Sequence, residues 1–427
     1  MEKIIISGGQ PLNGEIEVSG MKNSAVAVIF ACLLVDEKVT LKNVPQILDV
    51  DVALQIMERI GCKVSRPCVA TVEIDASEAQ GGRAPHELTD KMRASYYLLG
   101  AELGRFGHAR VGMPGGCNFG VRPIDQHIKA FESLGATVNE SDDIVEATAT
   151  RGLKGGNIFF DVVTVGGTMN ALIASVLANG NTEIENAARE PHIVDLANFL
   201  NTCGANIRGA GTDTIKVNGV EKLHGCAYAI IPDMIEAGTY MVAAAATGGR
   251  LRITNVIPKH LESITAKLNE MGVDVAEEDE AVVVSACERL EHINLKTMPY
   301  PGYPTDMQPQ ICVLMCLASG DSRLVEGVWD NRYRYVEELK RMGADITVNG
   351  RVAVVSGGKP LHPARVRAVD LRAGAAMVIA ALAIKGTSEI EDIRYIERGY
   401  DNIVGKLKAV GGQIKKIEVP ENLIYEG

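Results

Sequence analysis

Residues 58–64 read Glu-Arg-Ile-Gly-Cys-Lys-Val, the end of a helical stretch, then a glycine, then alternating residues typical of a strand. The same order recurs at 132–138, 201–207, 269–275, 340–346 and 408–414. Six copies fill the 427 residues. A repeat alone could also indicate a solenoid, but solenoid periods of roughly 20–50 residues are shorter than this one. The central glycines, which lie 68 to 74 residues apart, are Gly61, Gly135, Gly204, Gly272, Gly343 and Gly411.

Each copy also contains an earlier helix that is apolar on nearly all sides, such as 24–34, 169–177 or 373–384. A helix that is apolar all round is buried. The second helix of a copy, such as 52–57, is amphipathic, and the glycine after it supplies a left-handed C-terminal cap. Each copy therefore predicts strand, buried helix, strand, surface helix and strands, which is an α/β fold.

Six copies exceed the size of one hydrophobic core, because single cores stop growing near about 250–300 residues. The natural division is two lobes of three copies, with a boundary near residues 230–232. We expect the buried helices of each lobe to pack against one another. An opening strand at 4–18 precedes the first buried helix and could belong to either lobe.

The composition is that of a globular protein, with 46% hydrophobic and 23% charged residues. It excludes a disordered or fibrous chain. The longest apolar run, 25–35, is shorter than the roughly 18 residues that a membrane span needs. Nine cysteines without a regular framework fit a reducing compartment, and the first residues lack a secretory pattern. The sequence therefore predicts a cytoplasmic protein without a membrane partner.

The formal net charge is −11, and the sequence contains no cluster of Lys and Arg. Nucleic-acid-binding proteins usually carry a basic stripe, so we expect no nucleic-acid partner. An anionic small molecule would have to be captured by a few specific cations against an unfavourable overall field.

Charged residues stand at the starts of four buried helices, where Lys22, Arg93, Asp306 and Arg372 occupy equivalent places in successive copies. A helix N-terminus attracts anions through its unpaired N–H groups and its dipole, and a lysine there reinforces the effect. Four unrelated helix caps are the alternative. The register of the repeat favours convergence of these side chains in a cleft between the lobes.

Residues 113–125 read Met-Pro-Gly-Gly-Cys-Asn-Phe-Gly-Val-Arg-Pro-Ile-Asp and predict an exposed, mobile loop. A cation near Cys117 would lower the pKa of its thiol and make it nucleophilic. An inert thiol is the alternative from these residues alone. Four other cysteines lie in apolar stretches and are expected to be inert core residues: Cys32, Cys203, Cys312 and Cys316.

The sequence contains no pattern of metal ligands. Cys62 and Cys68 lack the usual zinc spacing and have no second pair, and the eight histidines are scattered. We therefore expect neither a metal nor another cofactor.

Two further arginines, Arg332 and Arg398, lie beside Gly or aromatic residues in loops that enter the second helix of the last two copies. Either could bind a phosphate or carboxylate through two hydrogen bonds. A surface ion pair is the commoner fate of an isolated arginine.

Together these motifs resemble the UDP-N-acetylglucosamine 1-carboxyvinyltransferase family, the enolpyruvyl transferases of peptidoglycan synthesis. The resemblance covers essentially the whole chain. It rests on Pro-Gly-Gly-Cys at 114–117 with Arg-Pro-Ile-Asp at 122–125, the run 299–306, Asp-Leu-Arg at 370–372, and Glu-Arg-Gly-Tyr at 397–400.

The resemblance implies a two-lobed enolpyruvyl transferase fold of six βαβαββ units, three per lobe around buried parallel helices. It implies that one lobe is discontinuous and combines 1–21 with 232–427, while 22–231 form the other lobe and carry the Cys117 loop. The active site is expected in the cleft between the lobes, with that loop closing over it as a lid.

The resemblance also implies the substrates, phosphoenolpyruvate and UDP-N-acetylglucosamine. Lys22, Arg122 and Arg398 are implied to bind phosphoenolpyruvate, with Asn23 bridging to the sugar. Asp306 is implied to be the general base toward the sugar hydroxyl. Lys22 and Arg398 are also counted among the catalytic residues, together with Cys117. Further candidates for anion binding or for the cleft are Arg332, Asp370 and Arg372.

In this family the cysteine of the lid is implicated as a proton donor and in product release. It forms a covalent adduct with phosphoenolpyruvate and is alkylated by the epoxide fosfomycin. Because position 117 is Cys rather than the Asp of resistant members, we expect this chain to be sensitive to fosfomycin.

The nucleotide sugar is implied to contact residues from both lobes. The family commonly has Ser-Val-Gly where this chain has Thr164-Val165-Gly166, and some members have Lys at the position of Val162, so the diphosphate contacts depart most from the family pattern. The implied residues are Asn23, Arg93, Arg122, Pro123, Ile124, Asp125, Gln126, Thr164, Val165, Gly166, Asp306 and Val328.

Two other functions stay open. An enolpyruvylshikimate phosphate synthase has the same fold and the same transfer, but the Cys117 loop and the Ser-Gly-Met-Lys-Asn opening at 19–23 argue against it. A non-catalytic paralogue that binds nucleotide sugar and regulates another protein would be expected to lack Cys117, Asp306 or Arg398, and all three are present. The oligomeric state is not predicted.

Overall fold

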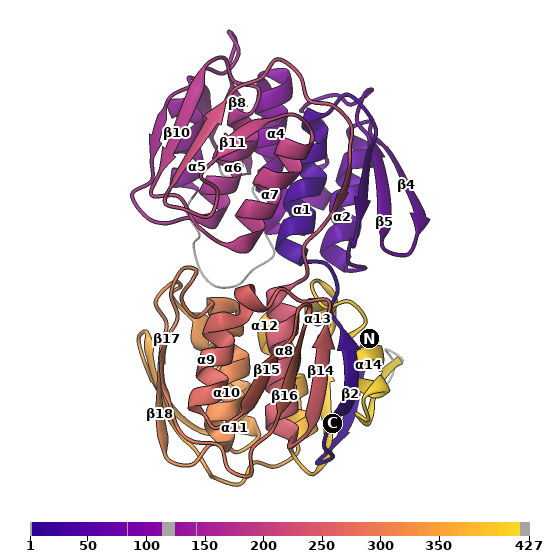
Figure 1. Cartoon of the computed structure of the whole chain (residues 1–427), viewed down its shortest axis with the longest axis vertical. Helices are drawn as coiled ribbons and strands as arrows, with labels where there is room; N and C mark the ends of the chain where they lie inside the picture. The colour runs from indigo at the N-terminus through magenta and orange to yellow at the C-terminus, as the bar shows by residue number, and fades with distance from the viewer. Residues whose placement is uncertain (1, 83, 113–123, 142, 419–427) are drawn as a thin grey trace. The chain divides into compact units, whose positions relative to one another are not determined.

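The computed structural model describes residues 2–82, 84–112, 124–141 and 143–418. The chain divides into two compact units (Figure 1). The N-terminal unit is Gly20–Ile231, and the C-terminal unit combines Met1–Ser19 with Pro232–Gly427. The chain therefore passes between the units twice.

The N-terminal unit alternates helices and short strands, with η marking a 3₁₀ helix. Its elements are α1 (Lys22–Ala31), η1 (Cys32–Leu34), β3 (Val39–Lys42), α2 (Leu48–Arg59), β4 (Lys63–Cys68), β5 (Thr71–Asp75), α3 (His86–Thr89), η2 (Arg93–Tyr96), α4 (Tyr97–Phe106), β6 (His108–Gly112), α5 (Asp125–Ser133), β7 (Thr137–Glu140), β8 (Ile144–Thr148), β9 (Asn157–Phe159), α6 (Val165–Ser175), β10 (Asn181–Glu185), α7 (Pro191–Thr202), β11 (Asn206–Arg208), β12 (Thr214–Asn218) and β13 (Ala227–Ala229).

The C-terminal unit follows the same order. Its elements are β1 (Glu2–Gly8), β2 (Asn13–Glu17), α8 (Met234–Thr247), β14 (Arg250–Thr254), η3 (Pro258–Leu261), α9 (Glu262–Glu270), β15 (Asp274–Glu277), β16 (Ala281–Ser285), β17 (Asn294–Lys296), η4 (Thr305–Met307), α10 (Gln308–Leu317), β18 (Asp321–Val325), η5 (Arg332–Tyr335), α11 (Val336–Arg341), β19 (Asp345–Asn349), β20 (Val352–Ser356), β21 (Arg365–Arg367), α12 (Leu371–Ala383), β22 (Gly386–Glu391), α13 (Arg394–Glu397), α14 (Ile403–Ala409) and β23 (Ile414–Glu418).

Three helices form the centre of each unit: α1, α4 and α6 in the N-terminal unit, and α8, α10 and α12 in the C-terminal unit (Figure 1). In α1 every residue from Ser24 to Ala31 is buried, and in α12 every residue from Arg372 to Leu382 is buried. The prediction that apolar helices form the core is therefore confirmed. No helix in the described ranges is long and apolar enough to cross a membrane.

The sheets surround these helices in one recurring pattern. The strand orders are β13-β3-β5-β4, β6-β8-β7 and β11-β12-β10-β9 in the N-terminal unit, and β15-β16-β14-β2, β17-β18-β20-β19 and β21-β22-β1-β23 in the C-terminal unit. Five of the sheets contain one parallel pair beside antiparallel pairs; Ile184 of β10, for example, lies opposite Ile158 in parallel and opposite Ile215 in antiparallel register. In three of these sheets a buried helix connects the strands of the parallel pair, as α6 connects β9 to β10.

At each of the two passages between the units, the last strand before the passage and the next helix belong to different units. β2 precedes α1 in the sequence but pairs in parallel with β14 of the C-terminal unit. Conversely, β13 precedes α8 but pairs in parallel with β3 of the N-terminal unit. β2 and β13 therefore each form these backbone hydrogen bonds within one unit, while the helix that follows in the sequence belongs to the other unit.

The expectation of one opening strand at 4–18 is wrong. The segment forms two strands in different sheets: β1 between β22 and β23, and β2 beside β14. The chain turns between them at Gly9, which has a φ of +91°, and Pro11 follows without an N–H group to continue a ladder. Because β1 pairs with both neighbours, the N-terminal strand completes the sheet of the sixth copy.

The repeat is visible in the backbone dihedrals. The glycine of each of the six copies has a left-handed φ between +86° and +101°, which confirms the predicted cap after the second helix. Asn43, Asn186 and Asn255 share a φ of +54°. Each donates its side-chain N–H to a carbonyl that follows the neighbouring parallel strand, at 2.6–2.8 Å.

We predict that Ile6→Ala destabilises the C-terminal unit selectively. The Ile6 side chain of β1 is fully buried, whereas that of Ile5 on the opposite face is half-buried. A buried Ile→Ala change costs about 2–5 kcal/mol, so hydrogen exchange of the α12 amides should accelerate more than that of the α1 amides. Ile5→Ala is the matched control; equal effects of the two variants would contradict this packing of β1.

Candidate active site

The start of α1 combines a helix N-terminus with a cation. Lys22 is the first residue of the helix, and its Nζ lies 2.9 Å from Oδ2 of Asp49 on the first turn of α2. Both side chains are largely buried, with exposed fractions of 15% and 5%. A lysine at the first position of a helix adds its charge to the N–H groups and the dipole of that helix end, a combination that favours an anion. Asn23, the next residue, is half-buried.

A buried carboxylate fixes the next residue of α1. Asp195 of α7 accepts hydrogen bonds from the Ser24 hydroxyl, from the Tyr228 hydroxyl at 2.6 Å and from the Ile231 N–H at 3.4 Å. Burial raises the pKa of Asp195, and these donors oppose the increase. Asp195 thereby joins the start of α1 to the segment that leaves the N-terminal unit.

Besides Asn23 on α1, the described residues of the N-terminal unit that are expected to bind the nucleotide sugar lie at the starts of η2, α5 and α6. Arg93 is on η2, 5.6 Å from the ring centre of Tyr96. Ile124 is the buried residue before α5, and Asp125 and Gln126 begin that helix. The hydroxyl of Thr164 caps α6 by accepting from the Gly167 N–H at 3.2 Å, and Val165 and Gly166 are the first residues of α6.

Gln126 ties the start of α5 to the segment before α6. Its Oε1 accepts from the Asp161 N–H at 3.0 Å, and its Nε2 donates to the carboxylates of Asp125 at 2.9 Å and Asp161 at 3.1 Å. Lys129 also donates to Asp161, at 2.7 Å. Val162, the position at which some relatives have Lys, is exposed on the segment that follows.

In the C-terminal unit, Asp306 lies between two buried arginines. Nε and Nη2 of Arg372 are each 3.2 Å from Oδ2 of Asp306, and Nη2 of Arg332 is 3.6 Å from Oδ1. The arginine side chains are only 3–4% exposed, whereas that of Asp306 is 31% exposed. Two of the four residues expected at buried-helix starts, Asp306 and Arg372, are thus in contact within this unit, and the convergence of all four in a cleft between the lobes stays a prediction.

The backbone around Arg372 is fixed by Asp370, the N-cap of α12. Its Oδ1 accepts from the N–H groups of Arg372 and Ala373, both at 2.9 Å. The guanidinium also lies 5.3 Å from the ring centre of Tyr400. Arg398, half-buried at the end of α13, lies two residues before that tyrosine.

Glu326, which follows β18, holds two expected sugar-binding segments. Its Oε1 accepts from the N–H groups of Val328 and Trp329 at 2.9 and 3.0 Å, and its Oε2 accepts from the Thr305 hydroxyl at 3.1 Å. Thr305 is the residue before Asp306. One buried carboxylate therefore sets the position of Val328 relative to Asp306.

Three expected residues, Cys117, Arg122 and Pro123, lie outside the described residues, so the lid and its thiol stay predictions. The prediction that Cys32, Cys203, Cys312 and Cys316 are core residues is confirmed by their burial. Burial also raises the pKa of the Cys32 thiol.

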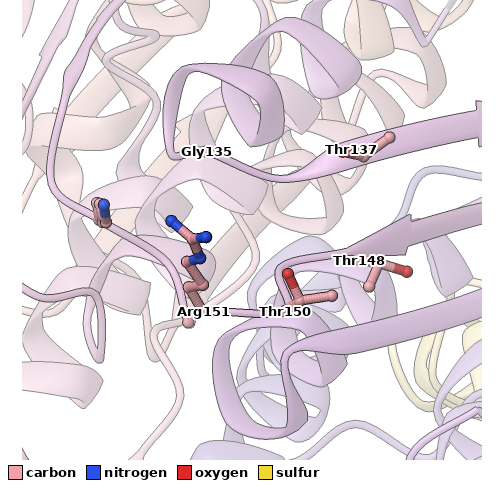
Figure 2. Close-up of a pocket in the computed structure, with 7 residues that line it drawn as sticks. Gly135, Thr137, Thr148, Thr150 and Arg151 are labelled. Carbon is pink, nitrogen blue, oxygen red and sulfur yellow. The ribbon is translucent and has the colours of Figure 1, made fainter.

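A surface depression of about 380 Å³ lies at one end of the β7–β8 hairpin (Figure 2). Gly135, Thr137, Thr148, Thr150 and Arg151 line it together with Gly152 and Lys154, and Figure 2 shows Arg151 beside Thr150. All seven differ from the expected site residues. Within the described ranges, no three His, Cys, Asp or Glu side chains are grouped as metal ligands would be.

Comparison with known proteins identifies the family. The model of the EPSP synthase (3-phosphoshikimate 1-carboxyvinyltransferase) family matches residues 6–407. UDP-N-acetylglucosamine 1-carboxyvinyltransferase 2 of Clostridium acetobutylicum is 54% identical and covers 98% of this chain and 100% of its own length. The protein of the same name from Bacillus anthracis is 48% identical over 100% of this chain and 99% of its own. The chain belongs to the UDP-N-acetylglucosamine 1-carboxyvinyltransferase family.

Solved structures show the same architecture. The enolpyruvyl transferase NikO from Streptomyces tendae superposes with a TM-score of 0.88 at 27% identity, covering 98% of this chain and 99% of its own. An EPSP synthase from Acinetobacter baumannii superposes with a TM-score of 0.77 at 18% identity, covering 98% of this chain and 100% of its own, which is a likeness of fold alone. The two-lobed enolpyruvyl transferase fold is therefore confirmed for this member of the transferase family.

Three residues with contacts to the candidate site escaped the sequence analysis: Asp49, Asp195 and Glu326. Each is a single carboxylate that is buried in the structure. Asp49 is an acidic residue in the first turn of a helix, where a cap or dipole effect explains it equally well. Glu326 follows a strand in the stretch Arg-Leu-Val-Glu-Gly, which carries no signal of a bonding partner 21 residues earlier.

We predict that Glu326→Ala loosens the segment around Trp329, the only tryptophan in the sequence. The change leaves the partly buried N–H groups of Val328 and Trp329 without their acceptor, which costs up to about 1–3 kcal/mol. Acrylamide should quench the Trp329 fluorescence more strongly than in the unmodified protein. Glu337→Ala, which removes an exposed partner of Lys340, is the control; unchanged quenching in Glu326→Ala would contradict the role of Glu326.

Proposed function

We propose that this chain transfers the enolpyruvyl group of phosphoenolpyruvate to the 3-hydroxyl of UDP-N-acetylglucosamine and releases phosphate. Relatives named for this activity share 48–54% of their residues with it over at least 98% of its length. The transfer is the first committed step of peptidoglycan synthesis, and so contributes to cell-wall formation, cell shape and division. The structural observation that best supports it is Asp306 held between Arg332 and Arg372 at the start of a buried helix.

Phosphoenolpyruvate carries a phosphate and a carboxylate, and the chain offers a cation for each. We assign the phosphate to Lys22 at the N-terminus of α1, with Arg122 and Arg398. The guanidinium groups of Arg332 and Arg372 suit the carboxylate, because planar arginines bind carboxylates through paired hydrogen bonds. Nη1 of Arg372 is buried without a hydrogen-bond partner in the described part of the chain, which leaves a donor for such a ligand.

The reaction is an addition followed by an elimination. The sugar oxygen attacks C2 of phosphoenolpyruvate as its proton passes to Asp306, and C3 takes a proton, which gives a tetrahedral ketal. The ketal then loses phosphate from C2 and a proton from C3, which restores the double bond. Asp306 is suited to the first proton transfer because its carboxylate is partly exposed while the two arginines keep it in place. Cys117 is the proposed proton donor of the lid.

The two units carry different parts of this chemistry. Lys22, Asn23 and the starts of α5 and α6 belong to the N-terminal unit, and Asp306, Arg372 and Arg398 belong to the C-terminal unit. We propose that the substrates bind in a cleft between the units. The reaction needs no metal or other cofactor, and we expect it to take place in the cytoplasm.

Shikimate 3-phosphate is the alternative acceptor, since the matching family model is named for that activity. We expect the unmodified protein to release phosphate from phosphoenolpyruvate only when UDP-N-acetylglucosamine is present. Release with shikimate 3-phosphate instead would place the chain with the sister enzymes. Tight binding of the nucleotide sugar without phosphate release would indicate a regulatory paralogue.

We predict that Asp306→Asn lowers the rate of phosphate release by about 10²–10⁴-fold, the usual contribution of a general base. The amide keeps the shape of the side chain but accepts no proton from the sugar hydroxyl. Asp345→Asn, which removes an exposed partner of Lys359 in the same unit, should retain full activity. A loss below tenfold for Asp306→Asn would exclude Asp306 as the base.

We predict that fosfomycin adds once to the protein, at Cys117, and that mass spectrometry detects one adduct. The adduct should be absent from Cys117→Ser. Cys68, a described cysteine that is exposed, provides the control: Cys68→Ser should still be alkylated. An adduct that survives in Cys117→Ser would show that another thiol reacts.

A further inference from the structure

Asn170, in the middle of α6, places a polar side chain inside the apolar core of the N-terminal unit. Its side chain is fully buried. Oδ1 accepts from the Gly100 N–H at 3.1 Å, and Nδ2 donates to the Tyr96 carbonyl at 3.0 Å and contacts Nδ1 of His127 at 2.7 Å. One amide therefore joins three helices: α4, α5 and α6.

The contact with α4 requires close packing. Tyr96 and Gly100 are one helical turn apart at the junction of η2 and α4, and the amide bonds the carbonyl of the first and the N–H of the second. A Cβ atom on Gly100 would lie 2.5 Å from Oδ1 of Asn170 and 2.9 Å from its main-chain oxygen. Only glycine allows this approach, so the position of η2, which carries Arg93, depends on where Asn170 lies.

The contact with α5 determines which ring nitrogen of His127 carries the proton. The Gly100 N–H can only donate, which identifies the accepting atom of the amide as Oδ1 and leaves Nδ2 as the donor to His127. Nδ1 of the ring is then an acceptor, and its proton is on Nε2. Burial, followed by the charge of Arg93, lowers the pKa of His127 to about 4, against an opposing effect of Asp125, so the ring is neutral at physiological pH.

The opposite edge of the His127 ring faces the start of α6. A Cβ atom on Gly166 would lie 2.9 Å from both Cε1 and Nε2 of the ring. His127 therefore packs between Tyr96, whose ring centre is 5.7 Å away, and the backbone of Gly166. Asn170 holds the ring at one edge and Gly166 limits its position at the other.

We propose that Asn170 is a positioning residue for the nucleotide sugar: through His127 and Tyr96 it keeps the three helix starts that carry Arg93, Asp125–Gln126 and Thr164–Gly166 in one rigid arrangement. This inference rests on the proposed function, since it concerns how the acceptor substrate is held. Asn170 itself is buried in the core, one helical turn beyond Gly166, and would act through its neighbours.

If Asn170 served packing alone, its replacement would lower stability and leave substrate binding unchanged. Tyr96 is the N-cap of α4, so its carbonyl also accepts the first helical hydrogen bond, from the Gly100 N–H, and this pair remains when the amide is removed. His127 and the segment before it would lose their fixed position. Loss of the amide should therefore affect binding of the nucleotide sugar more than stability.

The test uses the full-length enzyme and its two substrates. In Asn170→Leu, which keeps the branched outline and the number of heavy atoms of the side chain but has no hydrogen-bonding group, we expect the KM for UDP-N-acetylglucosamine to rise about tenfold, the effect of losing one or two hydrogen bonds. The KM for phosphoenolpyruvate and kcat should change less than about threefold. Calorimetric titration with UDP-N-acetylglucosamine should show the same loss of affinity.

Asn201→Leu is the matched control. The Asn201 amide accepts from and donates to the backbone of Ile207, at 2.8 and 2.9 Å, in the same unit. Its loss should lower stability without changing either KM. If Asn170→Leu likewise leaves the KM for the nucleotide sugar within twofold, Asn170 is a packing residue and the inference is overturned.

Asn170→Asp provides a second measurement, and it replaces the first if the leucine variant fails to fold. A carboxylate beside Nδ1 would favour the protonated ring, so the pKa of His127, followed by NMR, should rise from about 4 toward its ordinary value of 6.5. Nucleotide-sugar affinity should fall in parallel. An unchanged His127 titration, or unchanged affinity, would overturn the inference.

The failure of the proposed function would look different. If the unmodified protein neither binds UDP-N-acetylglucosamine nor releases phosphate with it, the acceptor is wrong and the inference falls with it. If the unmodified protein is active and the Asn170 variants bind UDP-N-acetylglucosamine as tightly as it does, the proposed function stands. The positioning role of Asn170 alone is then refuted.

Discussion

Three helices in each unit are apolar around nearly their whole circumference, and they must be shielded from water on every side. The three helices cover one another only in part, so sheets and amphipathic helices cover the rest. That requirement is met by repeating one arrangement of strand, buried helix, strand, surface helix and strands. It also explains why a chain with few aromatic residues forms stable cores, because Ala, Val, Ile and Leu on closely packed helices leave little empty space.

Burial of the helix bodies determines where polar chemistry can lie. Their middles admit few polar groups, so charged residues concentrate at the first turns, where unpaired N–H groups and the helix dipole favour anions. Lys22, Asp306 and Arg372 all occupy such positions or the 3₁₀ turn that leads into them. The same helices that stabilise the units therefore present the groups that an anionic substrate requires.

Single buried polar residues then fix these positions. Asp49 holds Lys22, Glu326 holds the Thr305 and Val328 segments, and Asn170 holds His127 between Tyr96 and Gly166. A buried polar group is costly unless its hydrogen bonds are made, so each such residue favours one arrangement of its neighbours over all others. The site owes its geometry to these few contacts, whereas its stability comes from the apolar helices.

The sequence by itself determined the six copies, the buried helices and the left-handed glycines, because each of these has a local pattern: a spacing, an apolar face or a cap. The motifs with Lys22, Asp306 and Arg372 were also evident, since charged residues at equivalent helix starts stand out in a repeat. Only the tertiary structure decided that the opening segment forms two strands in different sheets. It also decided that β2 and β13 each pair with a strand of one unit, whereas the next helix in the sequence belongs to the other unit. It alone showed the partners of Asp49, Glu326 and Asn170. Asn170 and His127 are 43 residues apart, and a lone polar residue in an apolar run does not indicate which distant group it will bond.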